Sequence, residues 1–371
     1  MQGPASRGEV EGAPYQGPGG SGMIVFFPTY ARRLSGEHRW HATVAGMVTR
    51  PLPPRSRRRA MALAVLKRLL DLDDAQVESE VFQRRADAFF FQRVAGQPVR
   101  IALGGRLIDA GHTDRTGHFR ATFDLDEAAV PTVAPEGAWI PYEGLLDDEE
   151  STGMANTGSS SRRTDGTAGG GRIQLVGAHG LSVVTDIDDT IKVTNVANRR
   201  ELLANTFVRE FQAVPGMVGI YRRWQDEGTV FHYVSASPWQ LANCLGGFLR
   251  DAGLPAGSMH LKLFRLKDST PLGRLPLRKR LKRRTIEQIM AEFPDRRFLL
   301  VGDSGERDPE VYAAIARRNP EQVAGIVIRQ VEGKAPREKI RSRLDRLARR
   351  LPAGKLRVFV EAEELADVPL R

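Results

Sequence analysis

The stretch LSVVTDIDDTIKVT, residues 181–194, decides the fold of the second half of this chain. Its first part is short, apolar and rich in valine, which predicts a buried strand. The strand ends in a cluster of carboxylates, Asp186, Asp188 and Asp189, followed by Thr190. Such a cluster is electrostatically unfavourable unless a cation lies beside it. Open α/β sheets bind ligands at the carboxyl ends of their strands, so this stretch predicts a ligand site.

Strands and helices alternate through the rest of this half. Apolar runs predict strands at 173–176, 229–237, 297–304, 323–329 and 356–361. Helical spacing predicts helices near 202–211, 217–228, 238–249, 285–293, 309–318 and 337–350. This alternation is typical of an α/β fold with a doubly wound, mostly parallel sheet.

Polar residues follow three of these strands. Asp186 follows the strand that begins at Leu181, and Ser235 lies near the end of the strand 229–237. GDSGERD, residues 302–308, ends the strand that begins at Arg297. The carboxyl ends of parallel strands lie at one edge of a sheet, so we expect these residues to converge there.

The residue types at this edge suit phosphoryl transfer. Mg²⁺ prefers oxygen ligands and often takes one or two carboxylates, which Asp186 and Asp303 can supply. A carboxylate is also a competent nucleophile toward phosphorus. We therefore expect Asp186 to attack and Asp188 to act as general acid and base. Ser235 can donate a hydrogen bond to a phosphoryl oxygen, and a lysine would balance the remaining negative charge.

These motifs also carry a family resemblance. DIDDT fits the DxDxT motif of the haloacid dehalogenase (HAD) phosphatases, and GDSGERD resembles their late acidic motif. The segments DIDDTIKVTNV, VSASPW and LVGDSGERDPEVY together resemble the fungal actin-patch phosphatidate phosphatases and their bacterial relatives. The resemblance extends from about residue 173 to 330 and is compatible with 24–145. It implies a HAD-like catalytic domain that follows a β-rich one.

The resemblance implies a role for each matching residue. Asp186 would be nucleophile and metal ligand, and Asp188 would be general acid and base and offer its carbonyl to Mg²⁺. Thr190 would order the loop, Ser235 would hold phosphate, and Asp303 would ligate Mg²⁺ with Asp308 in support.

The family also has a catalytic lysine, which should precede the helix that comes before the GDSG strand. Lys282 fits its place best, Lys279 is second and Lys262 is a distant third.

The first half of the chain has a different pattern. IVFF after Met23, the alternating segments 40–48 and 118–125, and 99–103 predict strands, while 61–72 has helical spacing. We expect a smaller, β-rich, sandwich-like domain with a helical insertion. Its histidines, including His112 and His118, are scattered, and we interpret them as surface or structural residues.

Four segments result. Residues 1–22 are polar and rich in Gly and Pro, which predicts a disordered tail without a signal peptide. The β-rich domain spans 23–146, and residues 147–172, rich in Gly, Ser and Thr, predict a flexible linker or loop. The phosphatase domain spans 173–371.

Composition limits the partners. The chain has 371 residues, a formal charge of +10, a single cysteine, Cys244, and no apolar run long enough to span a bilayer. We expect a cytoplasmic protein, with peripheral contact to an anionic membrane as a possible addition. Nucleic acid is not an expected partner, and the sequence names no protein partner.

The motifs predict an Mg²⁺-dependent phosphatase, and the resemblance implies that it acts on phosphatidate to give diacylglycerol and phosphate. One alternative is a HAD phosphatase of soluble or nucleic-acid phosphomonoesters. Another is a catalytically vestigial lipid-binding or scaffold protein, which the intact acids disfavour. The basic run RKRLKRR, 278–284, is read by default as a solvated face, with an anionic surface as the rival partner.

Overall fold

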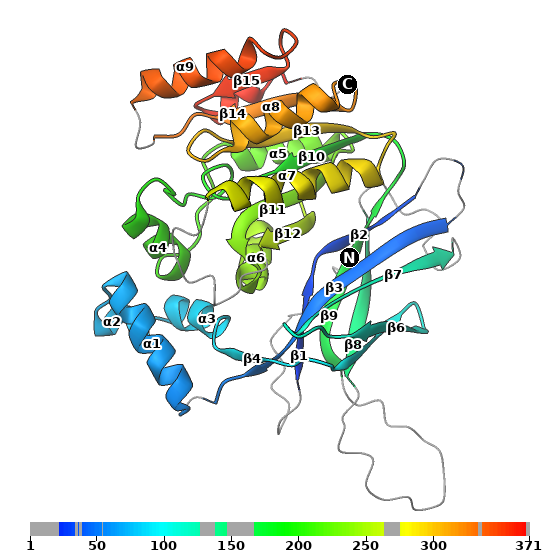
Figure 1. The fold of residues 1–371 in the computed structure, drawn as a ribbon, viewed down its shortest axis with the longest axis vertical. Helices are drawn as coiled ribbons and strands as arrows, with labels where there is room; N and C mark the ends of the chain where they lie inside the picture. Colours follow the sequence, from blue (N-terminus) through cyan, green and yellow to red (C-terminus); the bar gives the residue numbers. More distant parts are fainter. Residues whose placement is uncertain are drawn as a thin grey trace, which may run out of the picture.

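The chain forms two β-sheets, each with its own helices, in the computed structural model shown in Figure 1. The structure describes residues 22–33, 36, 39–53, 55–126, 138–146, 167–262, 275–332 and 336–368. The predicted tail falls outside this part of the chain, apart from its last residue. Most of the predicted linker, 147–166, falls outside it too. The mixed α/β class expected from the sequence is confirmed.

Within the part of the chain that the structure describes, the first sheet has nine strands. They are β1 (Met23–Phe27), β2 (Thr29–Arg32), β3 (Arg39–Pro51), β4 (Phe91–Arg93), β5 (Pro98–Leu103), β6 (Arg106–His112), β7 (His118–Asp126), β8 (Trp139–Leu146) and β9 (Thr167–Val176). The order is β1-β3-β2-β9-β8-β5-β6, with β4 and β7 also paired to β3. Phe26 of β1 lies 4.9 Å, between ring centroids, from Tyr142 of β8, four places away in this order. The sheet therefore folds over on itself around one apolar core.

Three helices are inserted between β3 and β4: α1 (Arg57–Leu70), α2 (Asp74–Glu78) and α3 (Glu80–Asp87). α1 begins where the side chain of Ser56 accepts a hydrogen bond from the backbone N–H of Arg59, as N-cap serines do. The apolar sides of these helices share a cluster with Phe207 of the second half. In Figure 1 this blue group lies beside α4.

Among the described residues, the second sheet has six parallel strands in the order β12-β11-β10-β13-β14-β15. Their bounds are β10 (Leu181–Thr185), β11 (Val230–Pro238), β12 (Ser258–Lys262), β13 (Arg297–Asp303), β14 (Val323–Arg329) and β15 (Leu356–Phe359). The helices are α4 (Arg199–Phe207), α5 (Met217–Asp226), α6 (Ala242–Ala252), α7 (Leu275–Glu292), α8 (Asp308–Arg318) and α9 (Arg337–Ala348), with 3-10 turns η3 (Trp239–Leu241) and η5 (Ala362–Leu365).

Helices cover both faces of this sheet. Alternate residues of a strand point to opposite faces, so Val183 and Val184 of β10 enter different cores. Val183 packs with residues of α5, α6 and η5, whereas Val184 packs with residues of α7, α8 and α9. Figure 1 shows α7 crossing in front of the sheet and α5 behind it. The central strands are buried on both sides, and their carboxyl ends meet at one edge.

The boundary between the two halves differs from the expectation. The sequence groups residues 173–176 with the second domain, but the structure pairs them with β2 and β8 in the first sheet. Residues 167–172, expected in the linker, form the start of β9. A short apolar run shows that a strand forms, but it does not show which distant strands pair with it.

The two sheets are in direct contact. The N–H of Met259, in β12, donates to the carbonyl oxygen of Pro28 at 2.8 Å. Tyr30 of β2 inserts its ring among those of His232, His260 and Phe293, at centroid distances of 5.2–5.9 Å. The β-rich domain therefore packs against the β11–β12 side of the parallel sheet. No helix among the described residues is long and apolar enough to cross a membrane.

This contact predicts a pH-dependent stability. Burial lowers the pKa of His260 to about 4, and Arg120 adds to the effect. The unfolded chain takes up this proton near pH 6.5 but the folded chain does not, so stability is present above about pH 6.5 and is lost as the pH falls toward 4. Between pH 7 and 5 the wild type should lose about 2 kcal/mol more than His260→Gln. Urea unfolding at both pH values measures the difference. The exposed His112→Gln should behave as wild type, and equal losses in all three proteins would contradict the prediction.

Candidate active site

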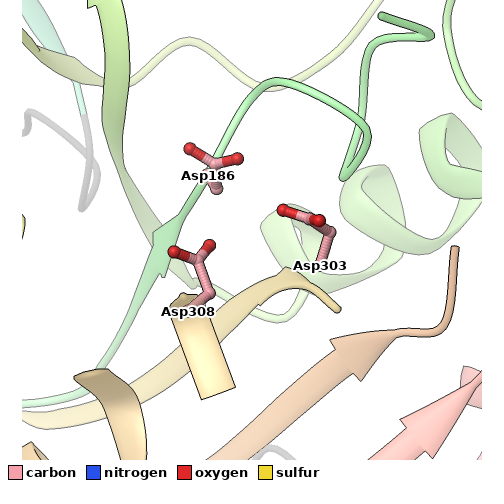
Figure 2. A group of neighbouring side chains, drawn as sticks. All are labelled: Asp186, Asp303 and Asp308. Atoms are coloured by element: carbon pink, nitrogen blue, oxygen red, sulfur yellow. The ribbon is translucent and has the colours of Figure 1, made fainter. Parts of the chain in front are cut away.

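Three acidic side chains meet at the carboxyl edge of the parallel sheet. Asp186 follows β10, Asp303 ends β13, which neighbours β10, and Asp308 begins α8. One carboxylate oxygen from each lies within 4.8 Å of the others, and all three residues are buried. Figure 2 shows the three carboxyl groups pointing toward one another. The parallel register of β10 and β13 produces this convergence, since it places Thr185, one residue before Asp186, beside Val301, two residues before Asp303.

The loop after β10 is held in place by Asp189, the third acid of DIDDT. Asp189 has a left-handed backbone, with φ of 55°, and its carboxylate accepts hydrogen bonds from the N–H groups of Thr194, Asn195 and Val196 at 2.6–2.9 Å. It therefore closes the loop on itself and does not cap a helix. This fixes the direction in which Asp186 and Asp188 leave the strand.

Lys282 provides the positive charge at the cluster. Its Nζ lies 3.0 Å from Asp186 Oδ1 and donates to both oxygens of Asp308, at 2.6 and 2.8 Å. Burial alone would lower the pKa of Lys282, but the nearby Asp186 and Asp308 carboxylates raise it well above its usual range. The lysine is therefore a fixed cation between two acids.

Lys282 alone does not neutralise the three buried carboxylates. Burial raises the pKa of Asp186 well above its ordinary value; Lys282 opposes this and Asp308 adds to it. Burial also raises the pKa of Asp303 well above its usual range, with Asp308 and Glu306 adding to it. Excess negative charge is what a bound metal cation would relieve.

The donor set fits a magnesium ion. Asp303 Oδ1 accepts from the N–H groups of Gly305 and Glu306, while its Oδ2 is buried without a hydrogen-bond partner among the described residues. Mg²⁺ takes hard oxygen ligands such as these. Asp186 and Asp303 are the best-placed ligands, because Lys282 already holds both oxygens of Asp308.

Asp188 lies in a different environment. Lys192 Nζ is 2.9 Å from its Oδ1, and the hydroxyl of Thr194 donates to the same oxygen at 2.7 Å. The hydroxyls of Ser237 and Ser235 donate to Oδ2 at 2.6 and 3.3 Å. Burial would raise the pKa of Asp188, but Lys192 and these hydrogen bonds hold it below the usual value.

The remaining predicted residues fall in three groups. Ser235 reaches Asp188, so the ends of β10 and β11 also converge. Thr190 is fully buried, and its hydroxyl has no hydrogen-bond partner within the described part of the chain. Of the three lysines considered, Lys282 contacts the acids, Lys262 lines a cavity that reaches the site, and the side chain of Lys279 lies outside the described residues.

Sequence reasoning missed two partners of Asp188. Lys192 is 2% exposed and is the buried cation of this carboxylate. A lysine four residues after an acid, inside an otherwise apolar and Thr-rich run, was the available signal. The second partner is Ser237, which makes a shorter hydrogen bond to Asp188 than Ser235 does. β11 extends to Pro238, so both serines lie on the strand.

Comparisons with known proteins point to one family. Residues 181–330 match the family model described as phosphatidate phosphatase APP1, catalytic domain. The chain is 27% identical over 367 residues to phosphatidate phosphatase APP1 of Saccharomyces cerevisiae, covering 82% of this chain and 59% of that protein. An uncharacterized protein of Schizosaccharomyces pombe is 31% identical over 163 residues, covering 43% of this chain and 26% of its own length. This chain thus spans less than two thirds of either relative.

Among solved structures, a magnesium and phosphate complex of D,D-heptose 1,7-bisphosphate phosphatase from B. bronchiseptica matches with 15% identity and a TM-score of 0.23. The match covers 51% of this chain and 99% of that one. At that score it carries no weight for fold or function. The catalytic-domain match and the yeast relative show that residues 181–330 are similar to the catalytic domain of APP1-like phosphatidate phosphatases.

Proposed function

We propose that this chain is a Mg²⁺-dependent phosphatase with a HAD-like catalytic domain and that its substrate is phosphatidate. The observation that carries the proposal is the buried contact of Asp186 with Lys282 at 3.0 Å, beside Asp303 and Asp308. A doubly wound parallel sheet with acids at its carboxyl edge supports the HAD-like assignment. A sandwich-like arrangement of the β-rich domain is part of the same proposal.

In the proposed reaction, a carboxylate oxygen of Asp186 attacks phosphorus and the bond from phosphorus to the ester oxygen breaks. Asp188 gives its proton to the departing oxygen, which leaves as an alcohol. The product on the enzyme is an aspartyl-phosphate at Asp186. Asp188 then takes a proton from water as the water attacks phosphorus, which releases phosphate and restores Asp186.

The surroundings of each acid suit these roles. Lys282 holds Asp186 in place and offers positive charge to the phosphoryl oxygens, together with the hydroxyl of Ser235. Lys192 keeps Asp188 ionised before substrate arrives, which is the form that accepts a proton from water. A phosphate dianion beside Asp188 would raise its pKa again and favour the proton-donating form. Mg²⁺, when bound by Asp186, Asp303 and the carbonyl oxygen of Asp188, would neutralise charge on the phosphoryl group.

Contact with an anionic membrane belongs to this proposal. The outer side of α1 exposes Met61 and Val65, which are 69% and 54% accessible, and the exposed Arg57 and Arg58 precede them. Apolar side chains flanked by arginine are typical of helices that lie in a membrane surface. Cytoplasmic location is likewise proposed and rests on the single cysteine.

A substrate panel tests the proposed function. The protein should release phosphate from phosphatidate in mixed micelles more efficiently than from soluble phosphomonoesters, because the family match names phosphatidate phosphatase. EDTA should abolish release and Mg²⁺ should restore it. Equal or better activity on soluble esters would reject the lipid assignment and favour a phosphatase of soluble or nucleic-acid phosphomonoesters. If the protein releases phosphate from none of the esters, the remaining hypothesis is the catalytically vestigial lipid-binding or scaffold protein.

The second prediction concerns the nucleophile. Asp186→Asn should reduce kcat by about 10³-fold or more, since the amide cannot form the phospho-enzyme. Circular dichroism should show an unchanged fold. The matched control is Asp226→Asn, at an exposed position at the end of α5, which should retain wild-type turnover. Mg²⁺-dependent turnover by Asp186→Asn at the wild-type rate would remove this residue as nucleophile.

The third prediction concerns the lysine that sequence reasoning missed. Lys192→Met should lower kcat by about 10- to 100-fold, because Asp188 loses its buried ion pair and its orientation. KM should change less, since Lys192 contacts the acid/base residue and lies away from the Asp186 cluster. Lys67→Met, which removes the exposed ion pair of Lys67 with Asp74, is the control. Steady-state kinetics of both variants decide, and an unchanged kcat for Lys192→Met would contradict the assigned role.

A further inference from the structure

A cavity of about 1100 Å³ lies between the two domains and reaches the candidate site. At the catalytic end its lining includes Ser235, Lys282 and Asp308. Lys282 and Asp308 belong to the carboxylate cluster, so the cavity is continuous with the place where a phosphoryl group would react. Its volume is at the upper end of the range for small-molecule sites and far exceeds the needs of a phosphate group alone.

Both domains contribute apolar walls. Trp239, Met259 and Leu261 line it from the catalytic domain, and Phe27 and Ala45 line it from the β-rich domain. The register of the first sheet explains the second wall. Phe27 of β1 lies opposite Ala45 of β3, which in turn lies opposite a residue of β7, so these side chains share one face of the sheet.

The two walls are locked together at Trp239. This side chain is 2% exposed and follows directly on the strand that carries Ser235. Its ring contacts those of Phe27, Phe91 and His118 from the β-rich domain, at centroid distances of 5.4–5.8 Å. The β-rich domain is therefore a fixed part of the cavity wall. His118, read from the sequence as a surface or structural histidine, belongs to it.

The cavity lining combines charged and apolar side chains. It includes the Lys282 cation beside the carboxylate cluster, the apolar residues of both walls, and the exposed Arg120 and Asp114 of the β-rich domain. A ligand that complements this lining has an anionic head at Lys282 and an apolar body of limited length. Inorganic phosphate and small sugar phosphates lack such a body.

We propose that the interdomain cavity binds the acyl-bearing part of a lipid phosphate monoester, and that the β-rich domain thereby selects the substrate. This inference rests on the proposed function, because it places the phosphate of the same molecule at Asp186. It adds that the apolar chain lies along the apolar lining that both domains supply, with Ala45 of the β-rich domain and Leu261 of the catalytic domain as two of its walls.

Binding of alkylphosphonates of increasing chain length tests the inference without turnover, because their carbon–phosphorus bond has no ester oxygen to release. Calorimetry measures the affinity of the full chain with Mg²⁺ present, at ligand concentrations below the critical micelle concentration of each alkylphosphonate. Affinity should rise by about two- to fourfold for each added methylene until the apolar section is filled, as burial of a methylene predicts.

Two variants locate the chain-binding wall. Ala45→Phe adds bulk to the β-rich wall, and Leu261→Asn makes the opposite wall polar; each should flatten the chain-length dependence while leaving the affinity for methylphosphonate unchanged. The matched control is Ala64→Phe, an exposed alanine of α1 outside the cavity lining, which should keep the wild-type dependence. Thermal unfolding checks that each variant is folded.

The outcomes separate the two hypotheses. Affinity that does not change with chain length in the wild type, or a chain-length dependence in folded Ala45→Phe and Leu261→Asn equal to that of Ala64→Phe, would overturn the inference. A protein that binds long alkylphosphonates but hydrolyses no phosphate ester would keep the inference and reject the proposed function. Mg²⁺-dependent hydrolysis of phosphatidate without chain-length-dependent binding of alkylphosphonates would keep the proposed function and overturn the inference.

Discussion

The ion pair of Lys282 with Asp186 and Asp308 is the interaction on which the site depends. Buried charges are costly unless they are paired, and three carboxylates cannot share a dry pocket without positive charge. Lys282 supplies part of it from α7, on one face of the sheet, while the acids come from β10, β13 and α8. The chemistry of the site therefore depends on the packing of α7 on the sheet, because moving α7 would leave the acids unpaired.

Asp186 and Asp188, two of the three acids of DIDDT, differ in their surroundings and not in their side-chain chemistry. Burial beside other carboxylates raises the pKa of Asp186, whereas Lys192 and hydroxyl donors hold that of Asp188 down. Two identical side chains, two residues apart, thus have pKa values that are shifted in opposite directions. Enzymes commonly assign acid and base roles in this way. The left-handed turn at Asp189 makes it possible, because it sends the chain back so that Lys192 faces Asp188.

Much of this arrangement could be predicted from the sequence, because it depends on local rules. Apolar runs that end in acids identify β10 and β13, and parallel pairing then brings Asp186 and Asp303 together. What could not be predicted depends on distant contacts. β9 joins the first sheet because its partners are β2 and β8, and nothing in IQLV specifies them. His118 meets Trp239 only through the docking of two domains, so no spacing in the sequence reveals it.

The hydrogen bond from Met259 to Pro28 has a consequence for the solution behaviour of shorter versions of this chain. β12 is a terminal strand of the parallel sheet, and terminal strands expose unpaired N–H and C=O groups that recruit other chains. Here the segment between β1 and β2 covers that border, and Tyr30 seals it with aromatic contacts. A catalytic half expressed without its β-rich partner would present this border to solvent together with the uncovered ring of Phe293. Self-association through β12 would follow. The β-rich domain therefore also protects the chain from aggregation.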